Sequence, residues 1–260
     1  VQIRFMPNMG SFVGSDILAG IAATKIHLSE EYCVLVDIGT NGEIAVGNSR
    51  RILCASTSAG PAFEGASISN GMCALTGAIS SVSIADSGSL VSHVIGNGTP
   101  RGICGSGLID AIAVYLKSGQ IDEAGAITNE DELKVNGITI SQKDIREVQL
   151  AKAAIATGIE LLTSKLSITR NDIEHVYIAG GFGSYINIDN AIAIGLLEFR
   201  KNKITALGNT ALIGAKMFLF EEKDAYDTIL KTSEHCSLET SGNFQDVFCD
   251  KLMFNNNQII

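Results

Sequence analysis

The spacing of apolar residues along this chain predicts an alternation of strands and helices. Apolar runs at 32–38 and 43–47 predict two strands joined by the turn Gly39-Thr40-Asn41-Gly42. Asn-Gly between two such runs is a strong β-hairpin signal. Further strands are predicted at 51–57, within 79–95, and over 174–179, where the sequence EHVYIA runs into glycines.

Helix start signals accompany the apolar positions that recur every three or four residues. Ser141 and Asp144 form a capping box before a long helix to 166, and Thr169 and Asp172 repeat the box for a short turn. Asn209 is placed to cap the apolar segment TALIGAKMFLF. Helices are also predicted at 11–28, 108–119 and near 244–254, with polar turns and short strands over 120–140. Strands that alternate with long helices predict an α/β fold.

Composition narrows the class of protein. The 260 residues are 46% hydrophobic and 18% charged, which is enough to bury a sizeable core in one large domain or two lobes. No apolar run approaches the length of a membrane span, and the first residues lack the pattern of a signal peptide. The net charge of −9, without any basic block, argues against nucleic acid as a partner.

Six cysteines without any C-x-x-C pair are typical of a reduced, cytoplasmic protein, and they do not form an iron–sulfur motif. The four histidines lack zinc spacing. Because the sequence does not begin with Met, we expect it to be a piece of a longer protein.

The turn after the first strand carries more chemistry than a hairpin needs. Asp37, at the strand end, can orient a magnesium ion through water. Gly39 and Gly42 let the backbone approach a phosphate, and Thr40 and Asn41 add side-chain donors. The alternative is a tight hairpin whose aspartate only hydrogen-bonds its own backbone.

Two more glycine loops extend this pattern. The segment Gly102–Gly107 directly precedes a helix, whose N-terminus attracts anions, although its glycines are also explained by close helix packing. The segment Ala179–Gly183 follows a strand, where a flat ligand such as adenine can lie against bare backbone. Three such loops in one chain indicate a nucleotide cleft. The predicted contacts in these two loops are Gly105, Ser106, Gly107, Gly180, Gly181, Phe182 and Gly183.

The order of motifs DIGTNGE, AGPAFEGA, PRGICGSGLIDA, QKDIREVQLAKAAI, IAGGFGSYI and GNTALIGA resembles one family. It is similar to the large C-terminal domain of the reductive activators of corrinoid proteins, in the actin, sugar-kinase and chaperone-ATPase superfamily. The resemblance runs from about Pro7 to about Phe220. It implies a ribonuclease-H-like ATPase lobe with a mixed sheet flanked by helices, so that residues 1–260 form a C-terminal nucleotide-binding domain. NMGSFVGSDILAGIA resembles one connecting helix, and Asn209–Ala215 resembles the other.

The resemblance also implies a function. Members of the family return cob(II)alamin to cob(I)alamin on the corrinoid protein of a methyltransferase system, driven by ATP with Mg²⁺. It implies a homodimer, and an iron–sulfur cluster in a part of the protein not present here. The superfamily site uses two D-x-G-T hairpins, and the first is expected upstream of Val1. We therefore expect the 260 residues alone to show negligible ATP hydrolysis and no corrinoid reduction.

Three acidic residues receive candidate roles. Asp37 is the expected catalytic and metal-orienting carboxylate. The resemblance places Glu64 beside the cleft, where it would position water or metal, although it is also explained as a solvated loop residue. Asp110 either faces the cleft or favours the start of its helix electrostatically.

Two other functions remain open from sequence. One is a non-catalytic dimerisation or interaction module, with an interface formed by the apolar helices at 150–166 and 209–220. The other is a small-molecule kinase of the same superfamily.

Overall fold

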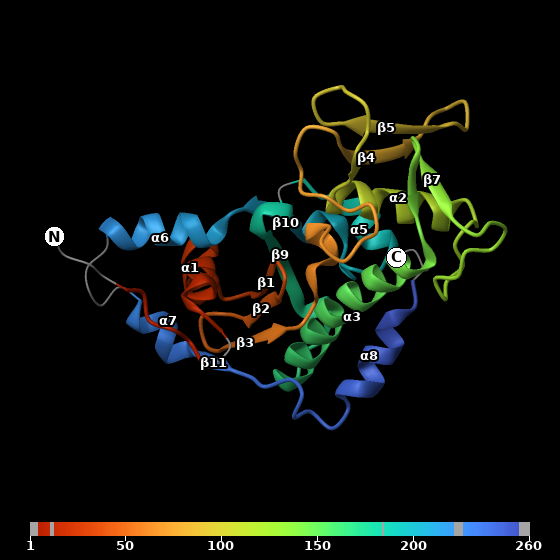
Figure 1. Cartoon of the computed structure of the whole chain (residues 1–260). Helices are drawn as coiled ribbons and strands as arrows, with labels where there is room; N and C mark the ends of the chain where they lie inside the picture. The colour runs from red at the N-terminus through yellow and green to blue at the C-terminus, as the bar shows by residue number, and fades with distance from the viewer. Residues whose placement is uncertain (1–4, 11–12, 184, 221–225, 255–260) are drawn as a thin grey trace.

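A six-stranded mixed sheet forms the centre of the protein, which is described here from a computed structural model that covers residues 5–10, 13–183, 185–220 and 226–254. The strand order is β10-β9-β1-β2-β3-β11 (Figure 1). β2 pairs antiparallel with both β1 and β3. β9 and β10 run parallel to β1, and β11 runs parallel to β3. The bounds are β1 Tyr32–Ile38, β2 Gly42–Gly47, β3 Ile52–Thr57, β9 Ile173–Ala179, β10 Ile204–Gly208 and β11 Ser233–His235.

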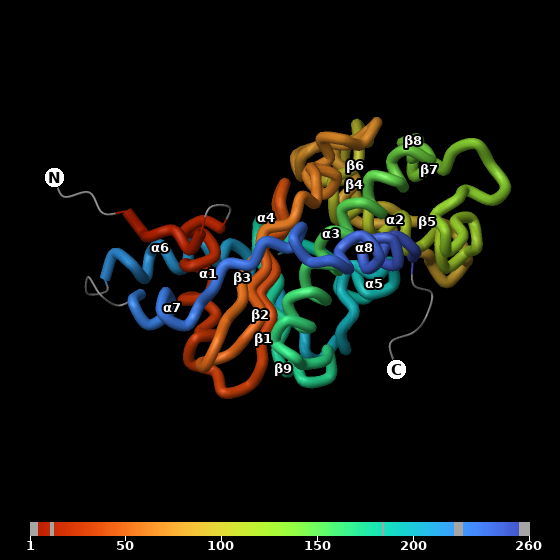
Figure 2. The backbone as a smooth tube through the Cα atoms, turned by 90° about the horizontal axis from the view of Figure 1, so that it is seen from below, coloured from red at the N-terminus to blue at the C-terminus, as the bar shows by residue number. Residues whose placement is uncertain are grey.

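Helices cover both faces of this sheet, because alternate residues of its central strand are apolar on both sides. Val34 and Val36 pack into the core that includes α3, whereas Cys33 and Leu35 pack into the core that includes α1. Figure 2 shows α1, α6 and α7 together at one side of the sheet, and α3 and α8 at the other. Their bounds are α1 Ser15–Thr24, α3 Gln142–Lys165, α6 Thr210–Phe220, α7 Asp227–Thr232 and α8 Phe244–Leu252.

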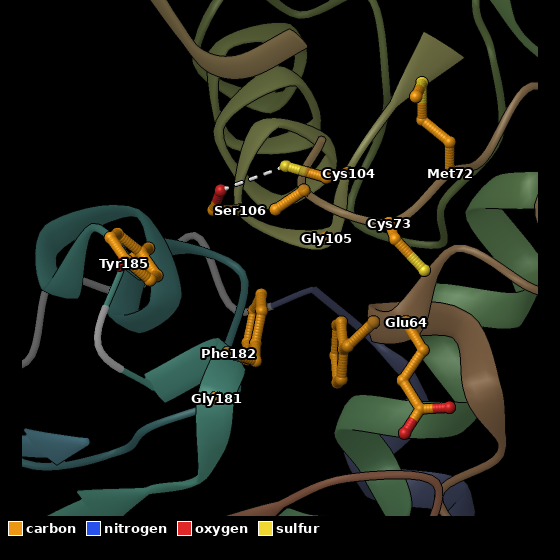
Figure 3. Close-up of a pocket in the computed structure, with 11 residues that line it drawn as sticks. Glu64, Met72, Cys73, Cys104, Gly105, Ser106, Gly181, Phe182 and Tyr185 are labelled. Atoms are coloured by element: carbon orange, nitrogen blue, oxygen red, sulfur yellow. Dashed lines mark hydrogen bonds between the residues drawn. The ribbon is translucent and has the colours of Figure 1, made fainter. Parts of the chain in front are cut away.

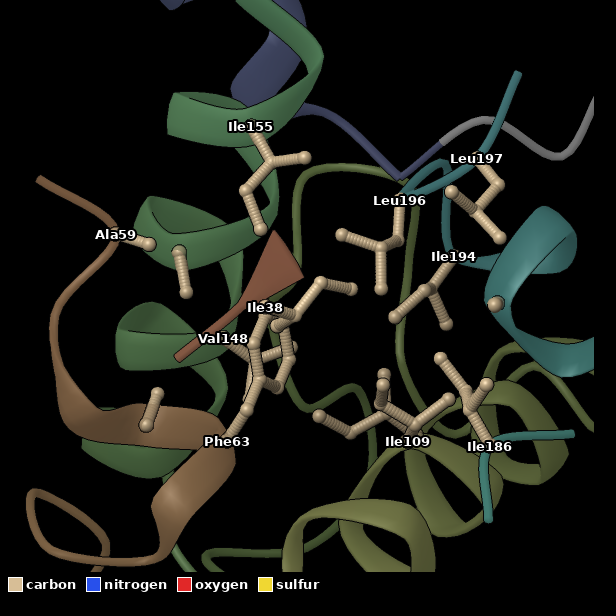
Figure 4. Packing of buried hydrophobic residues seen from close by; sticks show 14 of the residues in the cluster. Ile38, Ala59, Phe63, Ile109, Val148, Ile155, Ile186, Ile194, Leu196 and Leu197 are labelled. Carbon is tan, nitrogen blue, oxygen red and sulfur yellow. The ribbon is translucent and has the colours of Figure 1, made fainter. Parts of the chain in front are cut away.

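A smaller body of structure is inserted between β3 and α3. Its three-stranded sheet has the order β5-β4-β6, packs on α2, and is followed by the hairpin β7–β8 (Figure 1). Figure 4 shows Phe63, from the 3₁₀ turn η2, packing among apolar residues of β1, α2 and α3. The bounds are η2 Pro61–Glu64, β4 Ala78–Ile84, β5 Leu90–Val94, β6 Gly102–Ile103, α2 Gly105–Lys117, β7 Leu133–Val135 and β8 Ile138–Ile140. Helix α5 (Ile188–Ala193), which follows β9 in the chain, packs against α2.

The predicted helix starts are confirmed where local hydrogen bonds define them. The Ser141 N–H donates to Asp144 at 2.8 Å, and the Asp144 N–H donates to the Ser141 hydroxyl at 3.3 Å. Thr169 and Asp172 form the second capping box, at the 3₁₀ turn η3 (Arg170–Asp172). Asn209 accepts from the Leu212 N–H at 2.8 Å and so caps α6.

Two helix bounds differ from their predictions. The helix expected over 11–28 covers only Ser15–Thr24, because Lys25 adopts a left-handed conformation and a 3₁₀ turn, η1 (Ile26–Leu28), follows. Residues 11 and 12 lie outside the described residues. The helix expected from 108 begins three residues earlier, at Gly105.

The helix at 150–166, one of the two helices offered for the alternative interface, has little exposed apolar surface. Ile155, Ile159 and Leu162 of α3 are each no more than 3% exposed, because they pack on the sheet and the neighbouring elements. Leu150 is the large apolar residue of α3 that stays exposed. The second helix of that prediction, α6, does expose its apolar side chains: Leu212, Ile213, Leu219 and Phe220. None of the helices in the described ranges has the length and apolar character that crossing a membrane requires.

Candidate nucleotide site

The hairpin β1–β2 is confirmed, but its turn differs from the predicted one. Ile38 pairs with Gly42, so the loop has the three residues Gly39–Asn41 and is closed by the Gly39 N–H donating to Asn41 O at 3.0 Å. Gly42 therefore belongs to β2 and not to an Asn-Gly turn. A Cβ on Gly42 would lie 2.8 Å from both Ile155 Cγ1 and Thr57 Oγ1, so glycine is needed there for packing.

The Asp37 carboxylate lies where β1 meets β9. Asp37 pairs with Ala179 in the parallel register, and a Cβ on Gly180 would lie 2.8 Å from Asp37 Oδ1. The bare backbone of Gly180 therefore fits directly against the carboxylate. Within the described residues the Asp37 side chain accepts no hydrogen bond, which argues against the alternative of an aspartate bonded to its own turn. The carboxyl ends of β1 and β9, which lead into Gly39 and Gly180, thus lie side by side in one sheet.

Burial raises the pKa of Asp37 from 3.8 to about 6, and the neighbouring charge of Asp16 adds to the increase. Asp16 lies in the first turn of α1, and Glu43 lies opposite Asp37 in the hairpin. The pKa of Glu43 is raised by burial and by Asp16 and Asp37. Sequence reasoning missed Asp16 and Glu43 as site residues. The hairpin register contained the signal for Glu43, whereas the approach of α1 to β1 has no local signal.

Replacing Asp37 with asparagine is expected to stabilise the protein at pH 8 by about 1–2 kcal/mol, allowing for partial solvent exposure. The raised pKa means that the folded state holds the Asp37 proton more tightly than the unfolded state does. Asp37 therefore costs stability above pH 6, and that cost disappears as the pH falls to about 4. Thermal unfolding of both proteins from pH 4 to pH 8 measures the difference. A gain that does not grow with pH would contradict the assigned burial.

Glu64 lies at the tip of the hairpin and not on a solvated loop remote from it. The Thr40 hydroxyl is 2.9 Å from both carboxylate oxygens of Glu64, as donor to the acid. This bond joins η2 to the turn Gly39–Asn41. It leaves Glu64 exposed, with its carboxylate at the mouth of the neighbouring cavity.

A cavity of about 410 Å³ adjoins the hairpin, between η2, the first turn of α2, and α4 (Gly180–Gly183) (Figure 3). Phe63 and Phe182 stack in it with ring centroids 5.3 Å apart and planes 11° apart. The backbone at Gly181 is bare, since a Cβ there would meet nothing within 4 Å. The cavity is lined by Phe63, Glu64, Met72, Cys73, Ala74, Cys104, Gly105, Ser106, Gly181, Phe182 and Tyr185.

The structure brings only part of the two predicted glycine loops to this cavity. Gly105, Ser106, Gly181 and Phe182 line it, whereas Gly107, Gly180 and Gly183 do not. Gly180 lies instead against the Asp37 carboxylate. A Cβ on Gly107 would overlap Ile79 O of β4, and one on Gly183 would lie 3.0 Å from Ile178 Cγ2. For these two glycines, close packing is the explanation that the geometry supports.

The segment Gly102–Gly107 is not a loop. Its first residues form β6, and Gly105 begins α2, where a Cβ would overlap Phe63 O. Glycine is therefore required for α2 to start against η2. The Ser106 hydroxyl donates to Ser80 O at 2.8 Å, so this side chain is already paired. The segment Gly180–Gly183 likewise forms a single helical turn, α4.

Asp110 does not face the cavity. It lies in the second turn of α2, is 4% exposed, and accepts from the Val82 N–H at 3.2 Å and from Asn190 Nδ2 at 2.6 Å. It therefore joins α2 to β4 and α5. Burial raises its pKa, and the two hydrogen bonds oppose that increase.

Asp110→Ala is expected to destabilise the protein by about 2–3 kcal/mol, because it leaves the Val82 N–H and the Asn190 amide without partners. Chemical denaturation measures the loss. Asp86→Ala is the matched control, since Asp86 is an exposed residue before β5. Equal stability of the two variants would show that the buried contacts of Asp110 contribute nothing.

The chain is similar to proteins of one family. A family model described as "C-terminal domain of RACo the ASKHA domain" matches residues 31–259. The chain is 37% identical to the corrinoid activation enzyme RamQ of Eubacterium limosum, over 99% of this chain and 48% of the relative. It is 31% identical to a [Co(II) methylated amine-specific corrinoid protein] reductase of Methanosarcina barkeri, over 97% of this chain and 52% of that protein.

A solved structure agrees with these relatives. The reductive activator for corrinoid, iron–sulfur protein superposes with a TM-score of 0.86 at 36% identity, covering 96% of this chain and 44% of its own. The chain thus spans about half the length of the relatives that it matches. The resemblance drawn from the motifs is confirmed, as is the mixed-sheet, actin-like fold. This chain belongs to the family of the C-terminal ASKHA domain of RACo.

Proposed function

We propose that residues 1–260 form the nucleotide-binding domain of an ATP-dependent activator, which returns the cobalt of a corrinoid protein from Co(II) to Co(I). One observation carries the proposal. The pairing of β1 with β9 brings the hairpin turn, the Asp37 carboxylate and the aromatic cavity together at the carboxyl ends of these two strands. Nucleotides bind at this kind of edge in α/β proteins.

The residues at this edge match the parts of a nucleotide. The cavity is apolar and aromatic and its volume suits a nucleoside, since ligand sites of this kind hold about 300–1,000 Å³. In the turn Gly39–Asn41, the Gly39 N–H and the Thr40 hydroxyl donate to Asn41 O and Glu64. The backbone N–H groups of Thr40 and Asn41 and the Asn41 amide are the donors that would meet phosphate oxygens. The base would lie beside Phe182, and the phosphates would lie toward Thr40.

The carboxylates suit Mg²⁺, which prefers oxygen ligands and keeps several waters. Asp37, with Asp16 and Glu43 nearby, would hold the hydrated ion. Within the described ranges, no group of three His, Cys, Asp or Glu residues is arranged to bind a metal directly. When bound, Mg²⁺ neutralises charge on the phosphates. Asp37 would orient the waters around the ion, and Glu64, which accepts the Thr40 hydroxyl proton, would orient the attacking water with its remaining lone pairs.

The proposed partner is the corrinoid protein of a methyltransferase system. Its support is in the names of the two curated relatives, one a corrinoid activation enzyme and the other a [Co(II) methylated amine-specific corrinoid protein] reductase. The six cysteines are all free, which suits a cytoplasmic protein, and we propose that an iron–sulfur centre in another part of the protein supplies the electron.

The test is a spectroscopic assay of the native, full-length protein, since the 260 residues alone are not expected to reduce the cobalt. A cob(II)alamin protein is mixed with it, Mg²⁺ and a low-potential reductant, with and without ATP. The proposal expects cob(I)alamin absorbance to form at a rate that depends on ATP. If ATP binds but has no effect on the cobalt, a kinase of the same superfamily is favoured. If ATP does not bind and the cobalt is not reduced, an interaction module is favoured.

We also propose a homodimer that forms through α6. Its side chains Leu219 and Phe220 are 74% and 89% exposed, and a mean hydropathy of +0.25 is high for a chain that must cover its surface with few charges. Leu219→Asp is expected to convert the dimer to a monomer. Light scattering at high protein concentration checks this. A mass of 27.4 kDa for the unmodified chain would rule out the dimer.

A further inference from the structure

Tyr185 is an aromatic residue of the cavity that nothing in the described part of the chain covers. Its side chain is 77% exposed. Among the described residues its ring stacks on no other ring and its hydroxyl has no hydrogen-bond partner. A large ring held at the edge of a cavity without a protein partner is suited to contact a ligand.

Phe182 supplies a fixed surface beside it. One face of the Phe182 ring stacks on Phe63, which is 3% exposed, and its edge lies on the bare backbone of Gly105. The Tyr185 N–H donates to Phe182 O at 3.1 Å, so one turn of the chain carries both rings. Figure 3 shows both rings on the α4 side of the cavity, with Cys73 and Glu64 on the other side.

The cavity has few polar side chains. The Ser106 hydroxyl already donates to Ser80 O. Glu64 shares the one Thr40 hydroxyl proton between its two oxygens, so its remaining lone pairs stay available at the exposed side of the cavity. Cys73 and Cys104 offer only thiols, which are weak donors and acceptors. The cavity therefore has broad aromatic and apolar surface but few free side-chain partners for the edge of a base.

We propose that Tyr185 stacks on the base of the bound nucleotide, and that stacking, and not hydrogen bonding of side chains, holds the base. This inference rests on the proposed nucleotide site, and it adds a prediction of how weakly that site distinguishes one base from another. A pocket that does not pair the edge of its ligand rejects related ligands weakly. Stacking tolerates every base because each has a π face. Adenosine and guanosine triphosphates should therefore bind with similar affinity.

Calorimetry of the native protein with Mg²⁺ tests this with ATP, GTP and inorganic tripolyphosphate as probes. We expect ATP and GTP affinities within about threefold of each other. Tyr185→Ala should weaken both by about tenfold, as loss of one stacked ring does, while tripolyphosphate binds as before. Tyr185→Phe should bind like the unmodified protein. Phe5→Ala is the matched control, a similarly exposed aromatic residue that does not line the cavity.

The outcomes separate this inference from the proposed function. If the unmodified protein binds ATP and Tyr185→Ala binds it equally well, the stacking role is wrong and the nucleotide site stands. A GTP affinity more than about a hundredfold below that for ATP would overturn the selectivity alone, since it would require a paired base edge. If the unmodified protein binds neither nucleotide, the proposed function and this inference both fail.

Discussion

Asp37→Asn is expected to lower the Mg²⁺-dependent affinity for ATP by about 10–100-fold, the usual loss when a residue that orients a metal's ligands is changed. Asparagine has nearly the same shape, but it removes the charge that would attract the hydrated ion. Asp37 is the group at the β1–β9 junction whose carboxylate has no hydrogen-bond donor among the described residues. Titration of the native protein with ATP, in the presence and absence of Mg²⁺, measures the effect.

The same substitution should stabilise the fold at pH 8, so lost affinity cannot be attributed to unfolding. A variant that is more stable and binds less well is the signature of a buried charge kept for function. Asp86→Asn, which removes a charge far from the junction, should change neither property. If Asp37→Asn binds ATP as tightly as the unmodified protein with Mg²⁺ present, Asp37 is only a hairpin residue.

Gly180→Ala is expected to destabilise the protein by about 2–4 kcal/mol and to abolish nucleotide binding. Gly180 has a φ of +92°, which an L side chain adopts only with strain. Its added Cβ would lie 2.6 Å from Ile38 O and 2.8 Å from Asp37 Oδ1. The overlap separates β9 from β1 at the point where the site is assembled.

Gly181→Ala is the control for this prediction, since it adds the same methyl group at the next residue. Gly181 has no such φ, and its Cβ would meet nothing within 4 Å. This variant should unfold at the same denaturant concentration as the unmodified protein. Equal stability of the two alanine variants would show that the close contact at Gly180 is not required.

Elements whose start depends on nearby residues were predictable from the sequence. The capping boxes at Ser141 and Thr169 and the cap at Asn209 are formed by bonds that span three residues, so the local sequence contains both partners. The start of α2 was missed because glycine is a poor helix former. Gly105 and Gly107 lie in that helix because Phe63 O and Ile79 O approach too closely for any side chain.

The sequence was enough to predict which segments of the chain form the site. It was not enough to predict which side chains from distant segments lie next to one another there. The hairpin and the strand ending at Ala179 each have a sequence signal, and the resemblance placed Glu64 near them. No local pattern shows that Asp16 acts on Asp37, or that Asp110 lies away from the cavity, because both depend on packing between distant segments. Tyr185 was missed because a lone aromatic residue after a glycine turn has no distinctive spacing.

The most direct test of the nucleotide site is a crystal structure of the native protein with Mg²⁺ and a non-hydrolysable ATP analogue. The account predicts the base in the cavity beside Phe182, the phosphates against the turn Gly39–Asn41, and a hydrated Mg²⁺ facing Asp37. An analogue bound elsewhere on the protein, with the cavity and the hairpin both empty, would contradict it.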